Sequence, residues 1–140
     1  MTEPAGTGIL FLCVANSSRS QMAEGFARER APEGVEIYSA GSAPTAVNPL
    51  AVQVMRELGI DLSAHRSKAI AEIPADRIGT VVTLCAEEVC PVFPGEVKRL
   101  HWPMPDPAAA EGSDEERADA FRAVREMIRR QVTILMRYEA

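Results

Sequence analysis

A cysteine, an arginine and a serine stand close together in the stretch CVANSSRS (13–20), and side chains of these types can act on an anion. Cys13 ends an apolar run, and five small or polar residues separate it from Arg19. A loop that leads from a strand end into a helix start points backbone N–H groups at one spot, where the helix dipole adds positive potential. The stretch therefore predicts an oxyanion site formed by Val14, Ala15, Asn16, Ser17, Ser18, Arg19 and Ser20.

Cys13 is expected to be the nucleophile of this site. Such an environment favours a thiolate at neutral pH, and Ser20 is placed to hydrogen-bond the sulfur. Arg19 offers a planar fork of donors that suits a tetrahedral oxyanion and its transition state. The alternative is a small buried hydrophobe at a strand end, as most free cysteines are. The cysteine-to-arginine spacing at a strand-to-helix junction favours the nucleophile.

Apolar patterning predicts the elements that must position this loop. The expected strands are 8–14, 35–40, 78–85 and 97–102, and the expected helices are 20–31, 48–59 and one that begins at Ser113. Strands that alternate with helices predict parallel βαβ units and an open α/β sheet. Because ligands in such folds bind at the carboxyl ends of strands, we expect Cys13, Cys85 and the loop after His101 at one edge.

Length and charge limit the classes of protein to be considered. The chain has 140 residues, enough for one domain spanning 1–140, and a net charge of -5, which favours neither nucleic acid nor an anionic membrane as a partner. No apolar stretch approaches the length of a membrane span, and residues 1–8 lack the features of a signal peptide. The three cysteines do not make a purely structural disulfide framework. We expect a cytoplasmic monomer.

Five segments together resemble the low-molecular-weight tyrosine phosphatase family, most closely its thioredoxin-coupled arsenate reductase branch. The matching segments are CVANSSRSQMAEGFAR (13–28), YSAGSAP (38–44), NPLAVQVMRELGIDLSAHRSK (48–68), VVTLC (81–85) and HWPMPDP (101–107). The resemblance implies a three-layer open sheet of four parallel strands with helices on both faces. It also implies that Asp106 is the general acid and base, although an aspartate beside a proline is more often a turn residue.

The same resemblance implies a role for the second and third cysteines. An arsenylated Cys13 is attacked by Cys85, which expels arsenite and leaves a Cys13–Cys85 disulfide. Cys90 then attacks Cys85, regenerates Cys13 and leaves a Cys85–Cys90 disulfide, which thioredoxin reduces. No metal or bound cofactor is needed, and weak phosphatase activity is expected because phosphate and arsenate share shape and charge.

Other interpretations of these residues stay open on the sequence alone. Cys85 and Cys90 with His101 fall short of the four ligands of a structural zinc site, and both cysteines are also candidates for plain packing. A tyrosine phosphatase would use only Cys13, Arg19 and Asp106, but DPAA (106–109) lacks the tyrosines that follow the acid in many phosphatases. A non-catalytic oxyanion sensor would leave Asp106 without a task.

The sequence departs from the family pattern at three places. Ala15 replaces a usual glycine, which restricts the backbone of the loop. Cys85 and Cys90 are closer together than in the best-known members, so the connecting segment either needs less local unfolding to form a disulfide or strains it.

The third departure concerns a cation site beside the loop. Asn16, Glu24 and Ser39 match family positions that hold potassium, while Lys68 stands where an acidic ligand is expected. We predict that the Lys68 ammonium replaces the ion and orients Asn16 through Glu24. The alternative is a solvated surface lysine.

Overall fold

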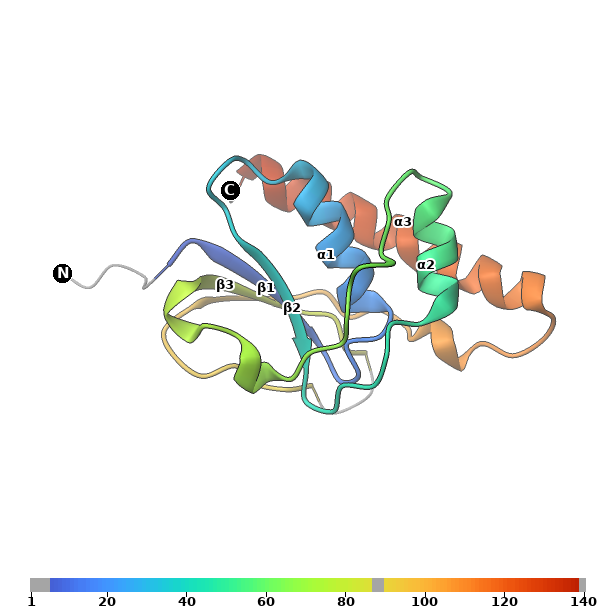
Figure 1. Ribbon diagram of the computed structural model, residues 1–140, viewed down its shortest axis with the longest axis horizontal. Coiled ribbons are helices and arrows are strands. Elements are labelled where there is room, and N and C mark those ends of the chain that lie inside the picture. The colour runs from blue at the N-terminus through green and yellow to red at the C-terminus, as the bar shows by residue number, and fades with distance from the viewer. Residues whose placement is uncertain (1–5, 87–89, 139–140) are drawn as a thin grey trace.

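The computed structural model of the protein describes residues 6–86 and 90–138 (Figure 1). Its strands are β1 (Gly8–Cys13), β2 (Ile37–Gly41), β3 (Ile78–Thr83) and β4 (Lys98–His101). Its α-helices are α1 (Arg19–Arg30), α2 (Pro49–Arg56) and α3 (Asp114–Tyr138), and its 3₁₀ helices are η1 (Ile70–Glu72), η2 (Ala75–Arg77) and η3 (Pro107–Ala109). All four strands and three α-helices predicted from the sequence are present.

The strands form one parallel sheet in the order β2-β1-β3-β4. The two apolar runs of the sequence are its central strands, and every residue of β1 is buried. Cys13 ends β1 opposite Gly41 of β2. On the other side of β1, Leu12 pairs with Thr83 of β3, so the segment that carries Cys85 leaves the same edge of the sheet. The α/β class and the four parallel strands are confirmed.

The three α-helices pack together on one face of the sheet (Figure 1). Alternate residues of β1 supply this face, because successive side chains of a strand point to opposite sides. Ile9 and Phe11 pack there against Phe26 of α1 and Phe121 of α3. Burial of such large apolar side chains contributes about 1.5–3 kcal/mol each. This layer fixes the direction in which α1 leaves the loop after Cys13.

The second face of the sheet carries a smaller apolar core. Leu10 and Leu12 of β1 meet Val81, Ile73 and Phe93 there. Helices cover this face as well, but they are the single-turn η1 and η2 and not α-helices. Pro74 lies between η1 and η2, where its missing N–H and its ring prevent the two turns from joining into one longer helix.

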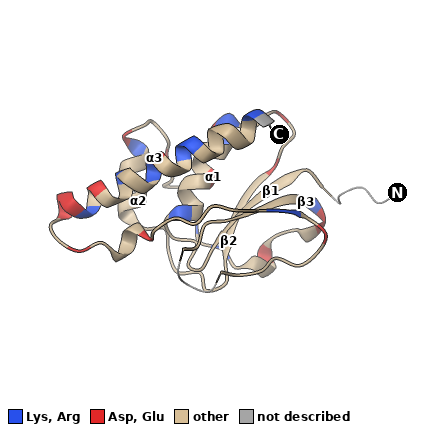
Figure 2. Cartoon of the chain, turned by 180° about the vertical axis from the view of Figure 1, so that it is seen from behind, with Lys and Arg blue, Asp and Glu red and all other residues tan. Residues whose placement is uncertain are grey.

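Helix α3 has the charge order that its dipole favours. Ser113 and Glu116 form the capping box predicted from the sequence, with Glu116 N donating to Ser113 Oγ at 3.1 Å and Ser113 N donating to Glu116 Oε1 at 3.1 Å. Acidic residues stand at its start and basic residues toward its end (Figure 2). Arg122 and Arg125 reach Glu57 after α2, each at 2.7 Å, and tie the two helices together.

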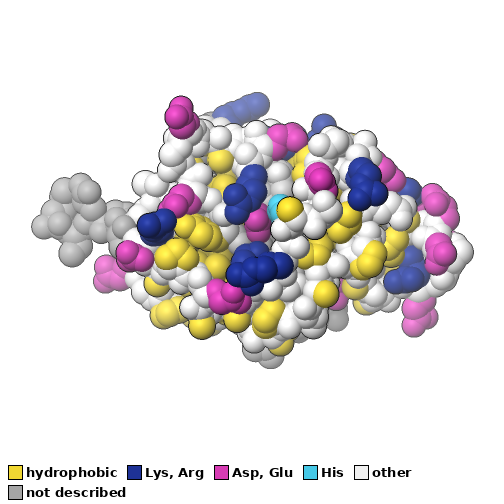
Figure 3. Space-filling view, viewed as in Figure 1, with side chains coloured by type: hydrophobic (Ala, Val, Ile, Leu, Met, Phe, Trp, Pro, Cys, Tyr) yellow, Lys and Arg dark blue, Asp and Glu magenta, His cyan; other side chains and the backbone are white. Residues whose placement is uncertain are grey.

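The surface of the described chain is mixed in character. Figure 3 shows basic and acidic side chains interspersed over one face, with hydrophobic side chains between them. No helix among the described residues is both long and apolar enough to cross a membrane.

Candidate active site

The loop from Cys13 to Ser20 encloses a small pocket at the carboxyl edge of the sheet. The pocket has a volume of about 90 Å³ and is lined by Cys13, Ala15, Ser17, Ser18, Arg19, Asp106 and Ala108. The loop lies directly against the end of β2. A Cβ atom on Gly41 would stand 2.3 Å from the Val14 carbonyl oxygen and 2.9 Å from the Asn16 nitrogen, so only glycine allows this approach.

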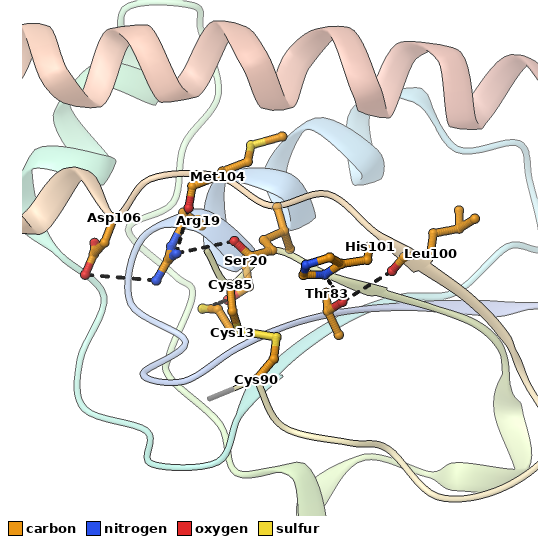
Figure 4. The surroundings of a disulfide bond; sticks show 11 residues. Cys13, Arg19, Ser20, Thr83, Cys85, Cys90, Leu100, His101, Met104 and Asp106 are labelled. Carbon is orange, nitrogen blue, oxygen red and sulfur yellow. Dashed lines mark hydrogen bonds and ion pairs between the residues drawn. A yellow bond between two sulfur atoms is a disulfide. The ribbon is translucent and has the colours of Figure 1, made fainter. Parts of the chain in front are cut away.

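Cys13 keeps a free thiol and is 2% exposed. Its sulfur lies 2.8 Å from Ser20 Oγ. Asn16 Nδ2 donates to that same oxygen at 2.8 Å, and an amide nitrogen can only donate. The Ser20 hydroxyl hydrogen is therefore available to point at the sulfur, where it stabilises negative charge (Figure 4).

Asn16 is the residue that holds the loop in shape. Its φ of 49° is left-handed, a conformation that asparagine tolerates better than most residues. Lys68 N donates to its Oδ1 at 2.8 Å, and Ser67 Oγ donates to its carbonyl oxygen at 2.6 Å. Among the described residues no other non-glycine residue has positive φ, so Ala15 fits this loop without a left-handed backbone.

Arg19 is buried beneath the pocket, with 4% of its surface exposed. Its Nη1 donates to the Met104 carbonyl at 2.9 Å and to the Leu84 carbonyl at 3.3 Å. These contacts join α1 to the ends of β3 and β4 and hold the guanidinium in one orientation. A fixed fork of donors needs little reorganisation when an oxyanion binds.

Asp106 lies at the rim of the pocket, on the segment after β4 (Figure 4). It caps η3, where its Oδ1 accepts from Ala108 N at 3.0 Å. Its Oδ2 stands 4.0 Å from Arg19 Nη2, and its side chain is 44% exposed. One carboxylate oxygen thus has a structural bond, while the other faces the arginine that the substrate is expected to contact.

Ser18 adds a further polar group to the pocket. Its hydroxyl oxygen is buried and has no hydrogen-bond partner within the described part of the chain. An unsatisfied buried hydroxyl costs about 1–3 kcal/mol. An oxyanion in the pocket that Ser18 lines would satisfy this group.

Glu24 is the centre of a buried charged cluster behind the loop. Ser39 Oγ donates to its Oε1, Arg28 Nε donates to its Oε2 at 2.7 Å, and Lys68 Nζ stands 3.6 Å from Oε1. Burial alone would raise the pKa of Glu24, but the Ser39 hydrogen bond and the nearby cations outweigh it and hold that pKa below its ordinary value.

Lys68 occupies the place between Glu24 and Ser39. Its Nζ donates to the Arg66 carbonyl at 2.8 Å and lies 3.5 Å from Ser39 Oγ. Burial lowers the pKa of Lys68, and the Glu24 carboxylate opposes this shift. The direct link from Lys68 to Asn16 is its backbone N–H.

Gln21 and His65 belong to this network, but they were not among the site residues predicted from the sequence. Gln21 Nε2 donates to Asn16 Oδ1 at 3.0 Å and to the Arg66 carbonyl at 2.9 Å. Its oxygen can only accept, so the His65 Nδ1 that lies 3.0 Å away carries the hydrogen. Burial lowers the pKa of His65 despite the attraction of Glu24. The position of Gln21 directly after Ser20 was the available signal.

Cys85 and Cys90 are joined by a disulfide, with Cα atoms 5.5 Å apart, within the ordinary range. Cys85 is 1% exposed, whereas Cys90 is partly exposed. Residues 87–89 of the expected loop between them lie outside the described residues. As a disulfide, neither sulfur is a zinc ligand, and across 6–86 and 90–138 no three His, Cys, Asp or Glu side chains gather as a metal site requires.

The chain is similar to known proteins over most of its length. The chain belongs to the low molecular weight phosphotyrosine protein phosphatase family, whose model matches residues 8–139. An arsenate reductase of Halalkalibacterium halodurans is 45% identical over 126 residues, which are 89% of this chain and 91% of that protein. The family predicted from the sequence is confirmed.

Solved structures of arsenate reductases are similar to this chain as well. One in the phosphate binding state has a TM-score of 0.81 and 32% identity, over 96% of this chain and 99% of the other. The thioredoxin-dependent arsenate reductase of Corynebacterium glutamicum has a TM-score of 0.62 and 28% identity, over 96% of this chain and 65% of the other.

Proposed function

We propose that this protein is an arsenate reductase that uses Cys13, Cys85 and Cys90 in sequence. The observation that carries the proposal is a free, buried cysteine in an oxyanion loop, together with two further cysteines joined as a disulfide. The identity to proteins named arsenate reductases supports the substrate. The backbone of residues 14–20 and the Arg19 guanidinium bind the arsenate oxygens.

The first step forms a covalent bond between Cys13 sulfur and arsenic. The thiolate attacks, one oxygen leaves arsenic, and Asp106 supplies the proton that lets this oxygen depart as water. Arg19 stabilises the negative charge of the remaining oxygens in the transition state. The position of Asp106 Oδ2, on the rim of the pocket and 4.0 Å from Arg19 Nη2, supports this role.

The second step is the reduction. Cys85 sulfur attacks Cys13 sulfur, the sulfur–arsenic bond breaks, and its electron pair stays with arsenic, which leaves as arsenite. Two electrons thus pass from the two sulfurs to arsenic, and a Cys13–Cys85 disulfide remains. Cys90 then attacks Cys85 and releases Cys13 as a thiolate. The Ser20 hydroxyl beside Cys13 favours this departure.

Thioredoxin is the proposed electron donor for the Cys85–Cys90 disulfide. Its redox potential of about -270 mV makes it a reductant of most exposed disulfides. The similarity to a structure described as thioredoxin-dependent supports this choice. We further propose a cytoplasmic, monomeric protein of one domain (1–140) without a bound metal or cofactor.

Lys68 is proposed to take the place of a potassium ion beside the loop. Its ammonium, 3.6 Å from Glu24, supplies positive charge there, and its backbone N–H holds Asn16 directly. Potassium added to the wild type should leave the KM for arsenate within about twofold. A marked fall of KM with potassium, compared with sodium at equal ionic strength, would refute this role.

A tyrosine phosphatase that uses Cys13, Arg19 and Asp106 is the competing function. It gives the cysteine pair no task. The deciding experiment couples arsenate to NADPH through thioredoxin and thioredoxin reductase. Arsenate-dependent NADPH oxidation is expected; its absence, together with brisk hydrolysis of para-nitrophenyl phosphate, would establish the phosphatase. The absence of both activities would point to the non-catalytic sensor.

A further inference from the structure

A groove lies beside the disulfide, on the face of the sheet opposite the three α-helices. It has a volume of about 240 Å³, and its lining includes Cys90, Val92, Phe93, Arg99 and His101. The oxyanion pocket shares none of these residues. The groove is smaller than ordinary pockets for small molecules, which are about 300–1,000 Å³. Its size suits one or two side chains from another protein.

The accessible sulfur of the disulfide belongs to this groove. Cys85 is 1% exposed, so an incoming thiolate cannot reach it along the sulfur–sulfur axis without displacing the core. Cys90 is partly exposed and lines the groove. Any protein that reduces this disulfide by thiol exchange must place its cysteine beside these lining residues.

The rim of the groove is apolar, although an exposed side chain there contributes little to the stability of the fold. Val92 is 79% exposed, the highest fraction among the large apolar side chains in the described ranges. Its neighbour Phe93 is 2% exposed and packs into the second core. Phe93 anchors the segment and fixes Val92 outward. An exposed apolar side chain next to a reactive sulfur is typical of a contact made with a partner.

The edge strand β4 adds positive charge to the same surface. Lys98 and Arg99 are exposed on it, with Glu96 as the acidic residue just before the strand. His101 Nδ1 lies 2.7 Å from Thr83 Oγ1, which fixes the ring beside the groove (Figure 4). The whole chain carries a net charge of -5, so this basic edge is a local feature that an acidic partner would complement.

We propose that the groove beside Cys90 is the docking surface for the protein dithiol that reduces the disulfide, a partner with an apolar contact for Val92 and an acidic rim for β4. This proposal rests on the proposed function only in requiring a protein dithiol as reductant. The partner's thiolate attacks Cys90 sulfur, the Cys85–Cys90 bond breaks and Cys85 leaves. The partner's second thiolate then resolves the mixed disulfide, so two electrons move to the cysteine pair.

The test uses the oxidised full chain without arsenate. Its disulfide is reduced by thioredoxin, with thioredoxin reductase and NADPH, and the kcat/KM of this reduction is measured. The quantity compared between variants is the ratio of this kcat/KM to the rate constant for reduction by dithiothreitol. Val92→Asp should lower the ratio of the two rates at least about tenfold, a loss of ~1.4 kcal/mol of docking free energy. Arg99→Glu should lower it about three- to tenfold and weaken its dependence on salt.

Ile134→Asp is the matched control, because Ile134 is 54% exposed on α3, on the opposite face of the sheet. Its ratio should stay within about twofold of the wild type. Equal ratios for Val92→Asp and Ile134→Asp would overturn the proposal. An equal loss of the reduction rate of Val92→Asp with glutathione would also overturn it, because the groove would then be a site for small thiols. A wild-type dimer that Val92→Asp dissociates would overturn it as well.

Failure of the proposed function is measured separately. Reduced protein is mixed with arsenate alone, and the loss of free thiols is followed over one turnover. Loss of thiols with no effect of Val92→Asp on thioredoxin would reject the docking surface and keep the reductase. No loss of thiols would reject the reductase, whatever the docking result.

Discussion

The loop around Cys13 and the segment around Cys90 leave the same edge of the sheet but are built in opposite ways. In the loop, Asn16 and Ser20 are fully buried, and the Ser67 hydroxyl and the Lys68 backbone N–H, more than forty residues away in sequence, donate to Asn16. In the segment, Cys90 is partly exposed and Val92 projects into solvent, with Phe93 as the anchor. A nucleophile that must meet a small oxyanion benefits from preorganisation, whereas a sulfur that must meet another protein needs access.

The largest expected effect is at the nucleophile itself. Cys13→Ser should lower arsenate turnover by about 10⁴-fold or more, because the hydroxyl is a far weaker nucleophile and the residues of the loop act as a unit. Phosphate affinity, measured by calorimetry, should change little, since Arg19 and the backbone donors remain. Substantial turnover by this variant would remove Cys13 from the first step.

Cys90→Ser tests the other region and should spare the first turnover. Cys13 and Cys85 can still react once, after which nothing resolves their disulfide. Mass spectrometry of peptides should find a Cys13–Cys85 disulfide and no more than one arsenite per chain. Undiminished multiple turnover of this variant with thioredoxin would contradict the three-cysteine relay.

Within the loop, Asn16 should matter more than its neighbour Ser20. Ser20→Ala removes one donor from the sulfur, and charge-assisted bonds of ~1.5–3 kcal/mol correspond to about 10- to 100-fold in single-turnover rate. Asn16→Ala removes the left-handed asparagine and its bonds to Lys68, Gln21 and Ser20, and its rate should fall further. Equal rates for Asn16→Ala and the wild type would show that the loop holds its shape without this network.

The smallest effect is expected outside both regions, at Glu57. The Arg122 hydrogen bond lowers the pKa of Glu57 most; burial opposes it, and the Arg125 hydrogen bond and the charges of both arginines bring the pKa to about 2. A lowered carboxyl pKa contributes stability above the unfolded value of 4.5, and this stability is lost as pH falls toward 2.

Glu57→Gln should therefore unfold more easily than the wild type at pH 7, by about 1 kcal/mol after screening by solvent. The difference should vanish near pH 2 to 3, as followed by urea unfolding. Turnover and disulfide reduction at pH 7 should be unchanged. A difference that is independent of pH would assign the stability to packing instead.

Periodicity and local motifs predicted most of the fold. The strands and helices lie within a few residues of their expected bounds, and Asn48 caps α2 through Leu50 N at 2.9 Å as its sequence pattern indicates. The 3₁₀ helices of the second face were not expected as such, because single turns carry no repeating apolar pattern.

The site was predictable only where it is local in sequence. Cys13, Arg19 and Ser20 lie within eight residues of sequence, and their proximity follows from the strand-to-helix junction. Gln21 and His65 meet across 44 positions, and His65 lies in the segment between α2 and η1, which has no helical or strand pattern to predict its path. The route from Lys68 to Asn16 uses a backbone N–H, a group that every residue other than proline carries, so sequence cannot single it out.

The coexistence of a free Cys13 with a closed Cys85–Cys90 disulfide bears on the order of events in steady state. The anion loop is fully assembled in the oxidised chain, with Ser20 already on the sulfur. Under the proposed relay, the next arsenate can therefore bind before or after the disulfide is reduced, and neither event has to come first. Phosphate should then compete with arsenate for the pocket, while the rate at which the Cys85–Cys90 disulfide is reduced stays the same.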